Sequence, residues 1–196
     1  IKRKIREITI LITLRSKEGK IISRNTLLVN SPKSYSIELN SLLQNTINKN
    51  SEFFGSIELE IFSTQDMIFP YPALVLQYYG ENFNTCVHTL GRIYNDFEDL
   101  NENEVFRVPE SGFDISCNDD LQPFISFVNG PIINKNAILN YTITNHKSEK
   151  FNGSFNVGEI QPYETMLLKL KENIPNLDQM LKNKPGSITL EHNLEG

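Results

Sequence analysis

The sequence is poor in the residues that build metal and redox sites. It has two cysteines, Cys86 and Cys117, which form no CxxC pair, and three histidines without HxH or HxxxH spacing. Zinc-ribbon and thioredoxin-like motifs are therefore excluded, and we expect neither a metal nor a cofactor. The acidic residues 118–120 lack the spaced oxygens and the glycine of a calcium loop. We interpret both cysteines as buried free thiols, and a disulfide between them in an exported protein is the alternative.

Long apolar runs and an excess of positive charge are also lacking. No segment approaches the ~20 apolar residues of a membrane-spanning helix, so we predict no membrane insertion. The 19 Lys and Arg residues are outnumbered by 24 Asp and Glu, and the net charge is −5. An acidic chain has no general attraction for nucleic acid, which excludes it as a partner. Because the chain begins at Ile1, we interpret it as a fragment or a processed form, and no compartment is indicated.

Motifs for nucleophilic catalysis are absent as well. The sequence contains no GxSxG, and no Cys–His pair is suggested by the local sequence. Carboxylate pairs of the glycosidase type stay open, because acids on separate strands leave no local signature. We therefore predict no catalytic residue from the sequence.

What the sequence does contain is a series of strand signals. The hydrophobic fraction of 39% is that of a globular protein. Ile57, Leu59 and Ile61 alternate with polar residues, which predicts a strand with one solvated face. Further strands are predicted at residues 8–14, 21–29, 35–39, 73–79, 86–96, 114–116 and 124–128, and short helices at 40–45 and 175–182. The run at 73–79 is continuously apolar, which predicts a strand covered on both faces or one at a domain contact.

A repeated GSIxLE pattern, at residues 55–60 and 186–191, indicates an internal duplication. In each copy the pattern follows a hairpin, a proline-containing turn with a tyrosine, an alternating strand and a short helical insert. We predict an all-β fold of two tandem antiparallel β-sandwich-like modules with short helical inserts. The modules are residues 1–110 and 111–196, and an acidic connector at 96–104 precedes the boundary. The second module is closed by residues 114–116 and 124–128, or it is incomplete at the C-terminus.

The first copy carries a combination of features that resembles a known family. They are the Lys17-Glu18-Gly19 hairpin, the Pro32 turn, the GSI segment and a later strand at residues 74–77 after Pro72. This combination resembles small β-sandwich domains of the sensory-rhodopsin-transducer type, over residues 8–90 and more thinly over 137–192. The resemblance implies a compact sandwich that oligomerises or binds a small ligand or partner, and it implies no catalytic residue.

Two segments are candidate ligand sites. Alternation along residues 86–96 places His88, Arg92 and Tyr94 on one strand face, where they would hold an anionic or sugar ligand. The alternative is a polar solvent face in which Arg92 pairs with a nearby acid. Residues 66–72 form an aromatic, proline-rich loop containing Asp66, Phe69 and Tyr71. Such a loop binds sugars or partner chains, or it plugs the end of the barrel.

These features favour a non-enzymatic binding or interaction protein, with a carbohydrate or another protein as its partner. One alternative is an enzyme that acts on sugar or cell-envelope material at a site near His88 and Arg92. Another is a structural or assembly subunit, a homo-oligomer in which the apolar strand at residues 73–79 pairs with another chain. The sequence does not identify the ligand.

Overall fold

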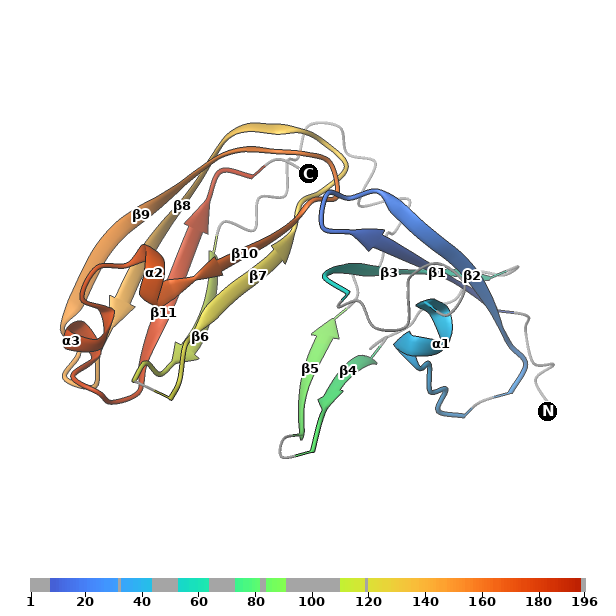
Figure 1. Cartoon of the computed structure of the whole chain (residues 1–196), viewed down its shortest axis with the longest axis horizontal. Coiled ribbons are helices and arrows are strands. Elements are labelled where there is room, and N and C mark those ends of the chain that lie inside the picture. Colours follow the sequence, from blue (N-terminus) through green and yellow to red (C-terminus); the bar gives the residue numbers. More distant parts are fainter. Residues whose placement is uncertain are drawn as a thin grey trace, which may run out of the picture. The chain divides into compact units, whose positions relative to one another are not determined.

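A computed structural model describes residues 8–31, 33–43, 53–63, 73–81, 84–90, 110–118 and 120–194 (Figure 1). Within these ranges the chain is mostly strand in antiparallel sheets, with three short helices, which confirms the predicted all-β class. The chain divides into two compact units, residues 1–62 with 108–196, and residues 63–107. The predicted module boundary near residue 110 stays a prediction. None of the described helices is long and apolar enough to cross a membrane.

The first sheet has the strand order β2-β1-β3, from β1 (Ile8–Ser16), β2 (Ile21–Val29) and β3 (Gly55–Ser63). A tight turn joins β1 to β2. The Ser16 N–H donates to the Lys20 carbonyl at 2.8 Å, and the Gly19 N–H donates to the Ser16 carbonyl at 3.0 Å. Gly19 has a φ of 79°, a left-handed conformation that glycine adopts without a steric penalty.

The second sheet has the order β6-β11-β8-β9 and faces a two-stranded sheet, β10-β7. Its strands are β6 (Glu110–Ile115), β8 (Asn134–Thr144), β9 (Lys150–Ile160) and β11 (Gly186–His192), and the facing pair is β7 (Phe124–Val128) and β10 (Thr165–Lys169). Helices α2 (Leu170–Asn173) and α3 (Leu177–Leu181) lie between β10 and β11 in the chain.

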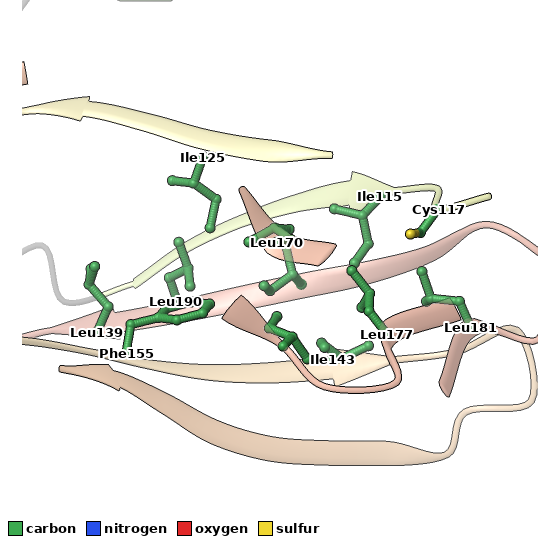
Figure 2. Close-up of a cluster of buried hydrophobic side chains, with 12 residues drawn as sticks. Ile115, Cys117, Ile125, Leu139, Ile143, Phe155, Leu170, Leu177, Leu181 and Leu190 are labelled. Carbon is green, nitrogen blue, oxygen red and sulfur yellow. The ribbon is translucent and has the colours of Figure 1, made fainter. Parts of the chain in front are cut away.

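The described hydrophobic core lies between these two sheets and under the two helices (Figure 2). Alternation explains the sheet contribution, since Ile188 and Leu190 of β11 are buried while the intervening Thr189 is not. The helices contribute Leu177 and Leu181, one turn apart on the same face. The buried cluster is Ile115, Cys117, Ile125, Leu139, Ile143, Phe155, Leu170, Ile174, Leu177, Leu181, Ile188 and Leu190.

The turn between β8 and β9 repeats the hydrogen bonds of the turn between β1 and β2. The Asn145 N–H donates to the Glu149 carbonyl at 3.1 Å, and the Ser148 N–H donates to the Asn145 carbonyl at 2.9 Å. Ser148 has a positive φ of 63°, as Gly19 has at the equivalent position. The strand order β9-β8-β11 also corresponds to β2-β1-β3. The two segments preceding and including the GSIxLE patterns therefore share hairpin geometry and strand order.

The strand predicted at residues 35–39 is wrong. The chain is irregular over residues 34–38, and α1 (Leu39–Leu43) follows. Local bonds to the backbone explain the difference, because the Tyr35 hydroxyl donates to the Ser31 carbonyl at 3.0 Å and the Ser41 hydroxyl donates to the Glu38 carbonyl at 2.6 Å. Such bonds compete with pairing in a sheet.

The second unit holds a hairpin of β4 (Ala73–Tyr79), at the predicted position, and β5 (Asn84–Leu90), which overlaps the start of the strand predicted at residues 86–96. Residues 91–96 lie outside the described residues. Val75 is 54% exposed and Tyr79 is 63% exposed, so β4 is not covered on both faces, and the alternative of a strand at a domain contact stays a prediction. A two-stranded hairpin has no second layer of its own to bury both faces. Cys117 is buried as predicted, whereas Cys86 of β5 is exposed.

Candidate functional site

The predicted ligand sites fall almost entirely outside the described residues. Arg92 and Tyr94 lie outside them, as does the aromatic loop with Asp66, Phe69 and Tyr71. His88 lies on β5, where its backbone pairs opposite Val75 of β4. Both predicted sites therefore stay predictions.

A cavity of about 350 Å³ lies between β7 and the sheet that contains β6, β11 and β8. It is lined by Phe113 of β6, residues 125–130 of β7 and its following turn, Leu139 of β8, and Leu190, His192 and Leu194 at the end of β11. Figure 2 shows Ile125 on the strand facing the sheet that carries Leu139 and Leu190. The volume is in the lower part of the ~300–1,000 Å³ range of ligand pockets.

Strand register places these side chains together. Phe113 pairs opposite Ile188 of β11, and His192 pairs opposite Leu139 of β8, so all four project from the same face of the sheet. Leu139 is buried and forms the floor, whereas Phe113 is 38% exposed and lies at the mouth. The cavity is thus open to solvent along the β6 side.

The cavity wall has few polar groups. The most buried of them, the Asn129 side chain, already makes hydrogen bonds within the protein. The Asn129 side chain donates to the carbonyls of Ile132 and Gln161, both at 2.9 Å, and accepts from the Asn134 amide at 2.6 Å. This buried network holds the end of β7 against the turn that follows β9, so its role is structural. The Leu194 N–H donates to Nδ1 of His192 at 3.3 Å.

One backbone edge of β7 faces away from its partner. The Asn129 N–H donates to the Glu164 carbonyl, and the Leu170 N–H donates to the Pro123 carbonyl, both at 2.9 Å. Odd-numbered residues of β7 therefore bond to β10, and by antiparallel alternation the N–H and C=O groups of Phe124, Ser126 and Val128 point to the opposite edge. No strand pairs with that edge among the described residues. Since no β10 residue lines the cavity, the cavity lies on this unpaired side.

The buried cation Arg15 does not form a ligand site, because its partners are all internal. Its Nε and Nη2 donate to one carboxylate oxygen of Glu58 at 3.2 and 2.8 Å, and its Nη1 donates to the Gly19 carbonyl at 3.3 Å. The Tyr163 ring covers the guanidinium at 3.9 Å. This cluster links the first sheet to the turn between β9 and β10. Glu58, on the face of β3 that was predicted to be solvated, is 37% exposed and is the ion-pair partner of Arg15.

No protein family, curated protein or solved structure matches the chain at a significant level. The resemblance to small sandwiches of the sensory-rhodopsin-transducer type stays a prediction. Across the described residues no group of three or more His, Cys, Asp and Glu side chains is arranged to hold a metal.

One feature of the sequence indicates the cavity. Residues 124–128 read Phe-Ile-Ser-Phe-Val, with apolar residues on both faces of one strand instead of one face. A short strand that is apolar on both faces is covered on both or is incompletely covered. Phe124 and Val128 are exposed, so this strand is incompletely covered. The residues across the cavity from this strand are set by the pairing of β6 with β11. Sequence periodicity does not reveal that pairing.

Proposed function

We propose that this protein is a non-enzymatic, protein-binding module whose site is the apolar cavity beside β7. One observation carries the proposal, namely that the cavity adjoins a strand edge without a partner among the described residues. An unpaired edge offers backbone hydrogen bonds, and an adjoining apolar cavity buries side chains. A polypeptide is the ligand class that uses both.

The lining favours a polypeptide over a sugar or a reacting substrate. Pockets for polar ligands orient them through several free polar groups, but the Asn129 amide is committed to backbone carbonyls. His192 is the single ionisable residue in the lining, and general acid–base chemistry requires further groups that bind and orient the reacting atoms. The carbohydrate-binding and enzymatic alternatives, with a site at His88 and Arg92, therefore rest on sequence reasoning alone.

We also propose that the chain contains two copies of one unit, in tandem β-sandwich-like modules at residues 1–110 and 111–196. Three features support this proposal: the matching turns, the matching strand orders β2-β1-β3 and β9-β8-β11, and the two glycines of the repeat. A Cβ on Gly55 would collide with the Arg15 carbonyl at the end of β1, and a Cβ on Gly186 would lie 2.6 Å from the Thr144 carbonyl at the end of β8. The repeat thus has the same steric cause in both places.

A role as an assembly subunit is the second candidate, and the surface of β4 favours it. Val75 and Tyr78 are both exposed on a strand that pairs with β5 alone among the described residues. Such a strand is a template for pairing with another chain. A mass that stays monomeric in light scattering at all concentrations would contradict this candidate.

The cavity proposal is tested by placing a charge at its mouth. Phe113→Asp changes a side chain that lines the cavity and is 38% exposed, and Ile138→Asp is the matched control because Ile138 is 39% exposed and is not in the lining. Random peptides displayed on phage are selected on the unmodified protein, and the affinity of the enriched peptides is measured by fluorescence anisotropy. We expect F113D to weaken binding about tenfold or more, and I138D to have little effect, because a charge in an apolar hot spot is not solvated.

Two results would contradict the proposal. One is a selection that enriches no peptide, and the other is equal loss of binding in F113D and I138D. Circular dichroism of both variants confirms that each retains its strand content before affinities are compared.

A further inference from the structure

We infer that the ligand is an extended peptide that adds as a strand to the unpaired edge of β7, with alternate apolar residues in the cavity and Lys or Arg flanking them. This inference rests on the proposed function and specifies its ligand. Backbone direction, side-chain spacing and charge each support one part of it.

The hydrogen-bonding groups of β7 specify the conformation of the ligand. Phe124, Ser126 and Val128 direct their N–H and C=O groups to the unpaired edge, at every second residue. These groups repeat about every 7 Å along the strand, a spacing that an extended chain matches and a helix does not. The five residues of β7 set the length of the added strand at about the same number.

The position of the cavity specifies the side-chain pattern of the ligand. Ile125 and Phe127 project from β7 toward the sheet that carries Leu190, and the cavity continues beyond them to Phe113. A strand beside β7 has every second side chain on this same face. An apolar residue at alternate positions therefore enters the cavity, while the intervening residues stay in solvent.

The charge around the cavity specifies the flanks. Two acidic residues adjoin the lining of the cavity: Glu191 lies between Leu190 and His192 on β11, and the carbonyl of Glu164 accepts from the Asn129 N–H. Lys135 of β8 adjoins Asn134, which donates to Asn129 of the lining, and the two glutamates outnumber it. Basic flanks are therefore attracted to this end of the sandwich, in a manner that salt screens.

The first arm of the test isolates the backbone edge. Ser126→Pro removes an N–H that points away from β10, so pairing of β7 with β10 is retained, and proline is tolerated at such edge positions. Ser126→Ala removes the same hydroxyl but keeps the N–H. We expect S126P to bind the peptide Lys-Lys-Val-Ser-Val-Ser-Val-Lys-Lys at least about tenfold more weakly than S126A does. Equal affinities overturn strand addition, provided that circular dichroism shows both variants folded.

The second arm tests the pattern and the charge of the ligand on the unmodified protein. A peptide of the same composition with its three valines adjacent, and one with Glu in place of Lys, are compared with the alternating peptide. We expect both to bind at least about tenfold more weakly, and the deficit of the Glu peptide to shrink at about 0.5 M salt. Equal binding of the three peptides, or of none, overturns the inference.

The outcomes separate this inference from the proposed function. Library peptides that lose affinity for F113D but bind S126P and S126A equally would support the cavity as a protein-binding site and overturn strand addition. A concentration-dependent increase in mass that S126P abolishes would show that a second copy of this chain occupies the edge, and it would also overturn the inference.

Discussion

At the residue scale, Gly186 shows how one missing side chain lets two strands meet. Gly186 is the first residue of β11, and a Cβ there would lie 2.6 Å from both the Thr144 carbonyl and the Leu181 side chain. Gly112 of β6 is the matched control, since its Cβ would have no contact closer than 3.8 Å. We expect Gly186→Ala to lower the free energy of unfolding by about 1–3 kcal/mol through overpacking. Gly112→Ala should change it by less than about 1 kcal/mol.

Urea denaturation followed by circular dichroism measures both variants. Equal midpoints for G186A and G112A would show that β11 moves aside without cost, and the steric explanation of the repeat would then be wrong. The sequence predicted both glycines as markers of a repeated strand start. It could not predict the cause, because Thr144 is far from Gly186 in the chain and is brought close only by pairing of β8 with β11.

At the element scale, the turn between β8 and β9 is stabilised by a carboxylate with two donors. One Glu149 oxygen accepts from Lys182 Nζ and from the Asn145 amide, both at 2.7 Å. The bond from Lys182, followed by that from Asn145, lowers the pKa of Glu149 below its ordinary value of 4.5. A carboxyl group whose pKa is lower in the folded state stabilises the fold above its unfolded pKa. That contribution is lost as the pH falls below about 4.5 and through the folded pKa.

The prediction is that Glu149→Gln flattens this acid dependence. The melting temperature of the unmodified protein should fall more steeply with acidification than that of E149Q, and the two curves should converge at the lowest pH. Glu191→Gln, on the exposed outer face of β11, is the control. Parallel curves for the unmodified protein and E149Q would contradict a role for this carboxylate in the turn.

Strands and helices were predicted well where the hydrophobic pattern alone determines the structure of the segment. Alternation at residues 57, 59 and 61 predicted β3, and the apolar face of residues 177–181 predicted α3. Residues 35–39 alternate too, yet form no strand, because the Tyr35 hydroxyl and the Ser41 side chain bind the local backbone. The cavity was not predicted for a different reason, because it depends on the pairing of β6 with β11, which are far apart in the chain.

At the scale of the whole molecule, contacts at the tip of the first hairpin link the β2-β1-β3 sheet to β10 and to the turn between β9 and β10. The Thr165 N–H of β10 donates to the Lys17 carbonyl at 2.8 Å, and the Tyr163 ring covers the buried guanidinium of Arg15 at 3.9 Å. Gly19 packs directly on the Pro162 carbonyl, which leaves no room for a Cβ. Because Arg15 is also paired with Glu58 of β3, one cluster connects β1, β3 and the turn after β9.

Removing the Tyr163 ring should therefore loosen the first sheet while the core of the second sandwich stays protected. Tyr163 has a φ of 59°, which asparagine tolerates, so Tyr163→Asn removes the ring without adding backbone strain. Tyr163→Phe keeps the ring and is the control. A cation–π contact with a desolvated guanidinium contributes about 1–2 kcal/mol, so amides of β1 and β2 should exchange roughly 5- to 30-fold faster in Y163N.

Hydrogen exchange read by mass spectrometry locates the effect. Unchanged exchange in the segment Ile8–Val29 would show that the first sheet is not stabilised through this contact. Faster exchange throughout β8 and β11 would show that the ring stabilises the whole unit and not the first sheet alone.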